Sequence, residues 1–276
     1  MTPGDFRFFQ ELLKKQAGLA LSFDKSYLLA TRLAPIASTH GLRTMSDMAD
    51  ALRSAKNPEI EDAVVEAMMT GETSFFRDVA PFECLRQHVL PSLIKARKDK
   101  KALRVWSAGC STGQEAYSLA IILKECGHDI SGWKVEIVAT DLSKAAVEQA
   151  RSGIYSQFDV QRGMPAKYLV RHFTQFGNMW HVKTETKAAV SFRPLNLLGD
   201  TSAFGSFDII LCRNVLSTLD MAAREKVLLT LHERLEPDGA LMLGASEGSI
   251  ASGHHFKPYP RIPGIFVRDD STFAAA

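Results

Sequence analysis

The chain has 276 residues, of which 46% are hydrophobic and 23% are charged. At roughly 150 residues per domain, this length suggests about two domains, and the composition supports a packed core and argues against general disorder. Thirty-three Lys and Arg against 31 Asp and Glu leave a formal net charge of +2. That balance is too small to indicate nucleic-acid binding from bulk electrostatics.

The cysteines, the histidines and the N-terminus bear on metal binding and location. The four cysteines show no C-x-x-C spacing, and the eight histidines show no metal-ligand spacing with cysteines or carboxylates, so no metal site is expected. The N-terminal MTPGDFRFF lacks a cationic start followed by an apolar core, and no 18-residue apolar run occurs. We therefore expect a cytoplasmic protein without a membrane-inserted segment.

The first seventy residues carry helical patterns. Thr2-Pro3-Gly4-Asp5 combines a capping hydroxyl, a proline at the first helical position and an acid three residues after the cap, which predicts a helix that ends near Gly18. Apolar residues at helical spacing predict further helices from about residues 24 to 41, from 44 and from 57. Because their apolar faces need a common core, residues 1 to about 70 are predicted to form a small all-helical domain.

Residues 79 to 101 continue as helix, with a break or kink near Pro91, and end in KARKDKK. We interpret that basic run as a solvated helix end. From Leu103 short apolar runs alternate with helical stretches: RVWSAG, EAYSLAIILKEC, VEIVATD, SKAAVEQARSG, then VSFRP, FDIILCRN, MAAREKVLLTLHERL and GALMLGAS. Such a pattern predicts a doubly wound α/β domain with a parallel sheet covered on both faces.

A segment at about 154–194 interrupts this alternation. Its second half, TQFGNMWHVKTETKAAVSF, carries a turn signal at Gly177-Asn178. We expect two or three short antiparallel strands there.

The residues that follow the first two strands indicate a nucleotide-type site, because ligands of such sheets bind beyond the carboxyl ends of the strands. Gly109 and Gly113 permit a tight turn ahead of a helix N-terminus. Asp141 after the second strand is placed to accept hydrogen bonds from ribose hydroxyls, or to cap the next helix. Glu115 in the first helical turn either favours the helix dipole or meets a cationic ligand group.

The glycine spacing is G-x-x-x-G, not the G-x-G-x-x-G of dinucleotide sites, so a pyrophosphate is a poor fit. A ribose acid and an ammonium partner without a pyrophosphate loop point to S-adenosylmethionine rather than NAD.

Five segments stand in order behind the helical region: GETSFFRD (71–78), SAGCSTGQEAYS, ATDLS, PLNLL and CRNV. This order resembles that of the chemotaxis receptor methyltransferases, the CheR family, over about residues 5 to 268. Those enzymes use S-adenosylmethionine to esterify glutamate side chains on bacterial chemoreceptors. The resemblance implies a helical receptor-recognition domain over 1–78, linker helices over 79–102, and an S-adenosylmethionine-binding methyltransferase domain over 103–276 that contains a small β-subdomain at about 154–194.

The resemblance also implies roles for individual residues. Thr73 and Arg77 match residues that lie against the methionine part of the cofactor, and Glu115 and Asp141 match the acids that meet its amino group and ribose. The family often has Asn where Gly71 stands, so only a backbone contact is proposed there. The remaining implied cofactor contacts are Asn196 and Leu197 near the adenine, and Arg213 and Asn214 after the fourth strand.

Two features of the family pattern bear on the receptor. The family commonly continues R-N-V-x-I-Y-F, and here Ser217, Thr218 and Leu219 replace the last three, so no tyrosine role near the acceptor is carried over. Some members bind a tethering peptide at the β-subdomain. This copy is short around FGN and lacks a longer Gly-rich loop, so we expect no dependence on such a tether.

Basic residues of the second predicted helix, Lys25 and Arg32, are candidates for contact with acidic chemoreceptor helices, or ordinary solvated side chains. The partners expected are thus the cytoplasmic domains of methyl-accepting chemoreceptors, without nucleic acid, and the cytoplasmic enzyme is expected to associate with membrane chemoreceptor arrays.

A glutamate carboxylate is already ionised at neutral pH, with a reference pKa of about 4.3, so no general base is needed. Arg77 is predicted to orient the incoming carboxylate, because a guanidinium grips one bidentately. A nucleic-acid methyltransferase ranks second, but it usually shows a D/N-P-P-Y-type segment where this chain has RNVL. An NAD-dependent oxidoreductase would need the pyrophosphate-binding glycine loop, which this chain lacks. The intact set of Thr73, Arg77, Glu115 and Asp141 argues against a non-catalytic module.

Overall fold

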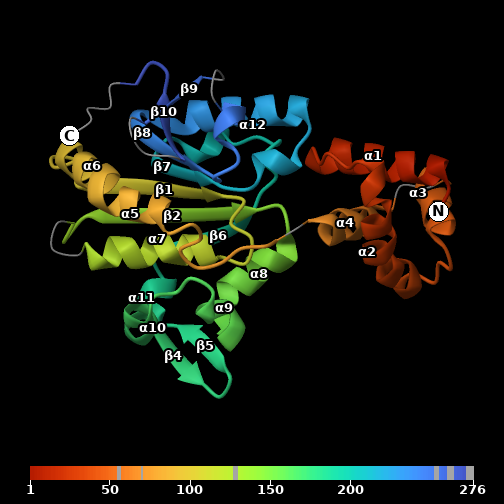
Figure 1. The fold of residues 1–276 in the computed structure, drawn as a ribbon, viewed down its shortest axis with the longest axis horizontal. Helices are drawn as coiled ribbons and strands as arrows, with labels where there is room; N and C mark the ends of the chain where they lie inside the picture. Colours follow the sequence, from red (N-terminus) through yellow and green to blue (C-terminus); the bar gives the residue numbers. More distant parts are fainter. Residues whose placement is uncertain (55–56, 70, 127–129, 252–254, 260–263, 272–276) are drawn as a thin grey trace. The chain divides into compact units, whose positions relative to one another are not determined.

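The fold is described from a computed structural model, which describes residues 1–54, 57–69, 71–126, 130–251, 255–259 and 264–271. The chain divides into two compact units (Figure 1). Unit 1 comprises Met1–Thr70 and Thr218–Lys226, and unit 2 comprises Gly71–Ser217 and Val227–Ala276. The segment GETSFFRD and residues 79–102 therefore belong to the same unit as the sheet.

Unit 1 is helical, as the sequence predicts. Its N-terminal part holds α1 (Pro3–Ala17), the 3₁₀ turn η1 (Phe23–Lys25), α2 (Ser26–Thr39), α3 (Met45–Ser54) and α4 (Pro58–Met68). The predicted capping box of Thr2 and Asp5 begins α1. At the start of α4, which lies where the sequence predicts a helix to begin, the Asn57 side chain accepts from the backbone N–H of Ile60. Gly18 ends α1 in the left-handed conformation, with a φ of 67°, which glycine adopts at little cost.

The core of unit 1 is made by one face of each helix. Its side chains recur three or four residues apart, which is the spacing that places residues on one side of a helix. The buried residues include Phe6, Phe9, Leu13, Leu29, Leu33, Met48, Leu52, Ile60, Val64 and Met68.

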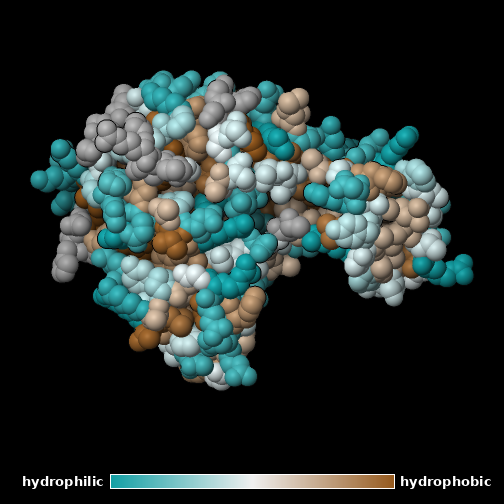
Figure 2. All heavy atoms as spheres, in the orientation of Figure 1, coloured by the Kyte–Doolittle hydropathy of each residue, from teal (hydrophilic) through white to brown (hydrophobic). Residues whose placement is uncertain are grey.

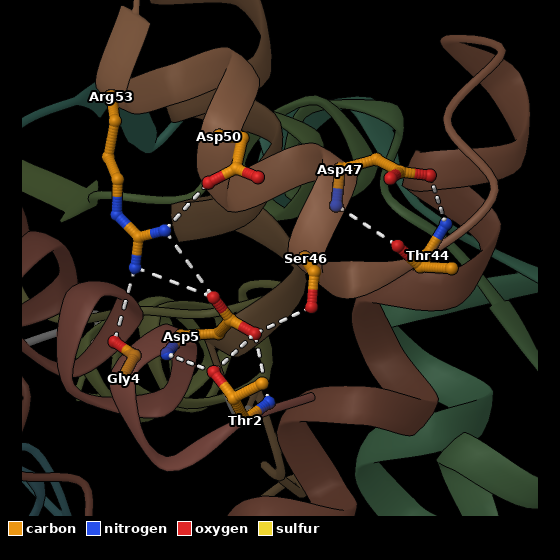
Figure 3. Close-up of polar contacts among 8 residues, drawn as sticks. All are labelled: Thr2, Gly4, Asp5, Thr44, Ser46, Asp47, Asp50 and Arg53. Carbon is orange, nitrogen blue, oxygen red and sulfur yellow. Dashed lines mark hydrogen bonds and ion pairs between the residues drawn. The ribbon is translucent and has the colours of Figure 1, made fainter.

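A buried carboxylate joins α1 to α3 (Figure 3). Asp5 accepts hydrogen bonds from the backbone N–H of Thr2 at 2.9 Å and from the Ser46 hydroxyl at 2.7 Å. Arg53 lies 3.4 Å from the same carboxylate. The bond from Ser46, followed by the bond from Thr2, lowers the pKa of Asp5 from 3.8 to about 2.

The chain returns to unit 1 at Thr218–Lys226, which sequence patterns did not foresee. Leu219 forms an antiparallel β-bridge with Leu19, and the backbone N–H of Asp220 donates to the carbonyl of Gly18 at 2.8 Å. A segment remote in sequence is therefore part of the helical unit.

The large sheet of unit 2 has seven strands among the described residues, in the order β6-β2-β1-β7-β8-β10-β9. The strands are β1 (Ala102–Ala108), β2 (Lys134–Asp141), β6 (Val190–Pro194), β7 (Phe207–Cys212), β8 (Leu235–Leu243), β9 (Phe256–Pro258) and β10 (Ile265–Arg268). The first five named are parallel to one another, as predicted. β10 runs antiparallel to β8 and β9. The sheet is therefore mixed at this edge, whereas the sequence pattern predicted a parallel sheet.

Helices cover both faces of this sheet, and α7 and α12 lie on opposite sides of it in Figure 1. The helices that alternate in sequence with the strands of this sheet include α7 (Gln114–Glu125), α8 (Lys144–Ser152), α12 (Met221–Arg234) and α13 (Gly248–Ala251). The strand order reverses between β1 and β7. The carboxyl ends of these strands are therefore where a ligand of a doubly wound sheet is expected.

The helix over residues 80–96 changes its winding ahead of Pro91. α5 (Ala80–Cys84) leads into a π-helical turn, η2 (Leu85–Val89), and then into α6 (Leu90–Ala96). A proline inside a helix lacks an N–H donor and crowds the carbonyl four residues earlier. The wider π turn accommodates that position, so the predicted irregularity is present as a change of helix type.

A small antiparallel sheet lies in the segment that interrupts the alternation. Its strands are β3 (Ile154–Ser156), β4 (Phe173–Phe176) and β5 (Met179–Val182), in the order β3-β5-β4. Gly177-Asn178 forms the predicted turn between β4 and β5. The stretch TETK, however, folds as α11 (Thr184–Lys187), and Val190–Pro194 pairs with β2 in the large sheet.

Two short helices complete this subdomain, α9 (Gln157–Gln161) and α10 (Ala166–His172). Several large hydrophobic side chains are exposed here, among them Phe158, Val170 and Phe176. Figure 2 shows hydrophobic atoms among hydrophilic ones over the small sheet.

Candidate active site

The site begins at the glycine turn between β1 and α7. Gly109, Ser111 and Gly113 have φ angles of 78°, 49° and 93°, a left-handed backbone that turns the chain sharply into the helix. The backbone N–H of Gly109 donates to the carbonyl of Thr140 at 2.8 Å, which ties the turn to β2. A Cβ at Gly113 would lie 2.8 Å from the Cβ of Ala150, so the turn has no space for a side chain at that position.

Asp141 ends β2 beside this turn and is buried. Its carboxylate accepts the backbone N–H of Ser111 at 2.7 Å and that of Ser143 at 2.9 Å. The N-cap of α8 is Ser143, whose hydroxyl accepts from the backbone N–H of Ala146. Asp141 is therefore not the helix cap that its position allowed, and its carboxylate is held at the carboxyl edge of the sheet.

The segment after β6 reaches the same place. The backbone N–H of Leu195 donates to the carbonyl of Asp141 at 2.8 Å. Asn196 and Leu197 follow directly and are half-buried, and the Asn196 side chain accepts the backbone N–H of Leu198 at 3.0 Å. A backbone hydrogen bond thus places the loop that carries the predicted adenine pair beside the predicted ribose acid.

A second carboxylate lies in the first turn of α7. Glu115 is 7% exposed and forms an ion pair with Arg213, whose side chain is 0% exposed. The other terminal nitrogen of Arg213 donates to Asp78 at 2.7 Å, and its guanidinium lies 5.6 Å from the ring centroid of Phe82. Residues from three separate segments therefore meet around one buried arginine.

Burial and the neighbouring arginines act on the pKa of Glu115 in opposite directions. Burial raises the pKa of Glu115 above its usual value, the positive charges of Arg213 and Arg77 lower it, and the negative charge of Asp78 raises it further. Because burial is the largest contribution, the net direction is upward. A cationic ligand group beside this carboxylate would favour its charged form, and the arginines alone do not offset the cost of burying it.

The GETSFFRD segment is fixed to the glycine turn at its first residue. The Ser111 hydroxyl donates to the backbone carbonyl of Gly71 at 2.8 Å, so Gly71 acts through its backbone. Arg77 donates to the carbonyl of Glu72 at 2.8 Å, and the Glu72 carboxylate pairs with Arg162 at 2.9 Å. Arg77 is half-buried and its charge acts on Glu115.

The two phenylalanines of this segment, Phe75 and Phe76, are buried. Phe75 packs edge-on against Tyr155, with ring centroids 4.9 Å apart. The backbone N–H of Phe76 donates to the Ser118 hydroxyl on α7 at 3.0 Å. A Cβ at Gly163 would lie 2.1 Å from the carbonyl oxygen of Phe75, so the chain passes over this segment in close contact.

Together these contacts describe a site with two buried acids at the carboxyl ends of β1 and β2, arginines around one of them, and a segment fixed across the glycine turn. Comparison with known families matches both units. The model described as "CheR methyltransferase, all-alpha domain" matches residues 4–69, and the model described as "CheR methyltransferase, SAM binding domain" matches residues 71–261. The chain belongs to the CheR methyltransferase family.

Individual relatives agree with this assignment. "Chemotaxis protein methyltransferase 1" of Pseudomonas aeruginosa is 38% identical over 268 residues, which cover 96% of this chain and 97% of that protein. "Chemotaxis protein methyltransferase Cher2" of Pseudomonas putida is 35% identical over 96% of this chain and 97% of its own length. "Chemotaxis protein methyltransferase" of Escherichia coli is 32% identical over 90% of this chain and 85% of its own length.

As a CheR family member, the chain is an S-adenosylmethionine-dependent methyltransferase, and the predicted fold, activity and cofactor are confirmed. Contacts and charge effects link Gly71, Arg77, Glu115 and Asp141 within unit 2. Thr73 is half-buried in the same segment.

Sequence reasoning did not single out three residues that organise this part of the CheR fold. Ser111 contacts both Gly71 and Asp141, Asp78 pairs with Arg213, and Glu247 is a buried carboxylate near Asn214. Ser111 stands inside the quoted glycine turn, where a hydroxyl between two glycines was the available signal. Glu247 follows the last parallel strand and carried no motif.

The two candidate receptor residues lie in unit 1. Lys25 is exposed in η1. Arg32 is half-buried on α2, and its guanidinium donates to the carbonyls of Ala67 and Met68 at 3.4 and 3.3 Å. These carbonyls end α4, where a cation also favours the helix dipole. Arg32 therefore has a structural contact that Lys25 is not shown to share.

Two further observations concern membranes and metals. No described helix is long and apolar enough to cross a membrane. The described residues include one group with metal-ligand atoms near one another, His232, Asp269 and Asp270. Arg268 pairs with Asp270 at 2.7 Å, so a cation of the protein already neutralises part of that group. The expected absence of a metal site stays a prediction.

Proposed function

We propose that this CheR family member transfers the methyl group of S-adenosylmethionine to glutamate side chains of bacterial chemoreceptors. The observation that carries the proposal is the pair of buried carboxylates, Asp141 and Glu115, held at the carboxyl ends of β1 and β2 beneath a fixed GETSFFRD segment. The curated relatives that match almost the whole chain are chemotaxis protein methyltransferases by name. That match supports chemoreceptors as the substrate class.

The residues present fit the cofactor. Asp141 would accept from the ribose hydroxyls, and Glu115 would meet the amino group, whose positive charge suits a carboxylate that burial alone disfavours. Arg213 Nε and Asn214 Oδ1 are buried, and neither has a hydrogen-bond partner among the described residues. Such atoms are rare in folded proteins. Their place after β7 fits a site that gains polar contacts when a ligand binds.

The remaining contacts follow from the same geometry. Asn196 and Leu197 would border the adenine, because their loop is tied to Asp141. Thr73 and Arg77 would lie against the methionine part, and Gly71 would contribute its backbone. When bound, the cofactor supplies an electrophilic methyl group on a sulfonium sulfur.

The protein's part in the reaction is placement. The acceptor glutamate is ionised at neutral pH, so its carboxylate needs alignment and not a general base. Arg77 would orient that carboxylate. Its guanidinium is held through the Glu72 carbonyl, and Glu72 in turn pairs with Arg162. The bond from Arg162, followed by its charge, lowers the pKa of Glu72, so this support remains charged at neutral pH.

Unit 1 is proposed to recognise the receptor, with Lys25 as the more direct candidate. Arg32 contributes to the same surface only in addition to its contact with the end of α4. The enzyme would then work where chemoreceptors are assembled.

We also propose that no receptor-tail tether is required. The β4–β5 connection is the two-residue turn Gly177-Asn178, because Phe176 pairs directly with Met179. A turn of this length offers no extended loop to enclose a peptide. Calorimetric titration with receptor C-terminal peptides should show no binding, and micromolar affinity would overturn this part of the proposal.

The function is tested by incubating the full chain with methyl-labelled S-adenosylmethionine and a chemoreceptor cytoplasmic fragment. The expected product is label on the receptor that alkali releases, because a carboxyl methyl ester is base-labile. A parallel incubation with DNA and RNA tests the second candidate, a nucleic-acid methyltransferase. Label in nucleic acid, or none in the receptor, would reject the proposed substrate.

A further inference from the structure

A fully buried glutamate lies beside the site and outside the residues considered so far. Glu247 stands between β8 and α13 and is 0% exposed. A buried carboxylate is costly unless it is paired or hydrogen-bonded. The contacts that hold it therefore show what it does.

Three backbone groups donate to this carboxylate. Glu247 Oε2 accepts the N–H of Asn214 at 2.7 Å and that of Gly244 at 2.9 Å. Glu247 Oε1 accepts the N–H of Ser217 at 2.9 Å. Hydrogen bonds to an ionised acceptor are about twice as strong as neutral ones. The loop after β7 is thus fastened at two points to the turn after β8.

The backbone at Asn214 and at Gly244 has the conformation and the space that this contact requires. Asn214 has a φ of 60°, a left-handed conformation that costs most residues energy and persists when its surroundings enforce it. A Cβ at Gly244 would lie 2.8 Å from Glu247 Oε2 and 2.9 Å from Asn214 Nδ2. Only glycine leaves room for the carboxylate and the asparagine to meet there.

The held residues are those that the site uses. Asn214 Oδ1 is one of the buried side-chain atoms that lack a hydrogen-bond partner among the described residues, and Arg213 Nε, one residue earlier, is another. Arg213 also bridges Glu115 and Asp78. The direction of the Arg213 side chain depends on the backbone on both sides of it, which is β7 before and the Glu247 contact after.

We propose that Glu247 is a positioning residue for cofactor binding, which acts by holding Arg213 and Asn214 toward the site through the backbone of their loop. The inference rests on the proposed function of that site. Glu247 touches neither substrate nor cofactor in this account. Its effect is transmitted through the two donors at Asn214 and Ser217.

The test is Glu247→Gln in the full chain. A glutamine amide nitrogen cannot accept, so at least one backbone N–H of the loop loses its partner. We expect affinity for S-adenosylhomocysteine, measured by calorimetry, to fall about tenfold or more, with cooperative unfolding retained. Amide exchange of the ligand-free protein should speed up at Asn214 and Ser217. The exposed Glu185→Gln is the matched control and should bind as wild type does.

Two further variants separate positioning from general stability. Gly244→Ala crowds the same carboxylate and should weaken binding in the same direction, even if Glu247→Gln fails to fold. In a double-mutant cycle, Glu247→Gln should add little to the loss caused by Asn214→Ala, because both act on one loop. If the affinity losses of the two single variants multiply, to within about twofold, to give the loss in the double variant, the two sites act independently and the proposal is overturned. Wild-type affinity in a folded Gly244→Ala variant would also overturn it.

The readout is binding of S-adenosylhomocysteine by the chain itself. A wild-type protein that binds this ligand but does not label receptors would reject the proposed substrate while leaving the role of Glu247 open to the same test. Conversely, receptor labelling with an unaffected Glu247→Gln variant would reject the positioning role alone.

Discussion

Replacing Asp5 by asparagine should destabilise the helical unit, because this carboxylate joins the start of α1 to α3. It accepts from Thr2 and Ser46 and lies 3.4 Å from Arg53 (Figure 3). An amide keeps one acceptor oxygen and loses the charge. The remaining nitrogen would then face donors instead of accepting from them.

The lowered pKa of Asp5 sets the size of the effect. A fall from 3.8 to about 2, at about 1.36 kcal/mol per unit, gives an upper bound of about 2.4 kcal/mol. The Arg53 side chain is 40% exposed, so solvent screens its charge and the effect falls to about 1 to 2 kcal/mol. Because the folded-state pKa is lowered, this stability is present above the unfolded value near pH 4. It is lost as the pH falls from about 4 to about 2.

Hydrogen exchange of the full chain at pH 7, followed by mass spectrometry, measures the effect locally. Peptides from α1 and α3 should exchange faster in Asp5→Asn, and unit 2 peptides should not change. Asp50→Asn is the matched control, because Asp50 is exposed and also pairs with Arg53. Urea unfolding should show the difference between wild type and Asp5→Asn shrinking below pH 4. Unchanged exchange in α1 and α3 would refute the reasoning.

Four other substitutions separate roles within the chain. Lys25→Glu should raise the Michaelis constant for receptor without altering cofactor affinity, whereas Arg32→Glu should also lower unfolding stability by about 1 kcal/mol, because it uncaps α4. Gly113→Ala should destabilise unit 2 by about 1–3 kcal/mol and weaken cofactor binding, since the new Cβ would meet Ala150. Arg77→Ala should abolish methyl transfer in a protein that stays folded.

Each of these outcomes has a control or a contradicting result. If Lys25→Glu has the same Michaelis constant for receptor as wild type, Lys25 is not part of the surface that binds the receptor. Unchanged thermal unfolding in Arg32→Glu would show that the contact of Arg32 with α4 adds no stability. If calorimetry shows wild-type cofactor affinity and unfolding in Gly113→Ala, the turn relaxes to accept the new Cβ. Arg86→Ala, an exposed arginine on the following helix, should keep the activity that Arg77→Ala loses.

Features set by neighbouring residues were predictable from the sequence. The capping box at Thr2 and Asp5 depends on atoms within three residues, and it forms as predicted. The fourth helix likewise begins at its predicted place, with Asn57 as its N-cap. The unalternating apolar runs predict parallel strands because both faces of the sheet are covered. The positions of Asp141 and Glu115 then follow from where β2 ends and α7 begins.

Features set by distant residues were not predictable. Thr218–Lys226 belongs to unit 1 through backbone pairing with Gly18 and Leu19, and a backbone hydrogen bond leaves no mark on sequence pattern. Arg32 reads as a free surface cation until the end of α4 is placed beside it. The pairing of β10 against β8 reverses direction at the sheet edge, which periodicity does not encode.

The site itself was predictable as a set of residues but not as a network. The resemblance placed Arg213 after β7, but not its simultaneous pairing with Glu115 and Asp78. Glu247 was missed because its partners are backbone N–H groups of a remote loop. Buried polar residues of this kind carry no periodic or spacing signal.

The most direct measurement is alkali-releasable methyl label on a chemoreceptor fragment, compared with the same fragment in which its candidate glutamates are replaced by glutamine. A glutamine amide is a poor nucleophile, so the account predicts rapid labelling of the first fragment and none of the second. Equal labelling of both fragments, or label that alkali does not release, would contradict methyl transfer to glutamate carboxylates.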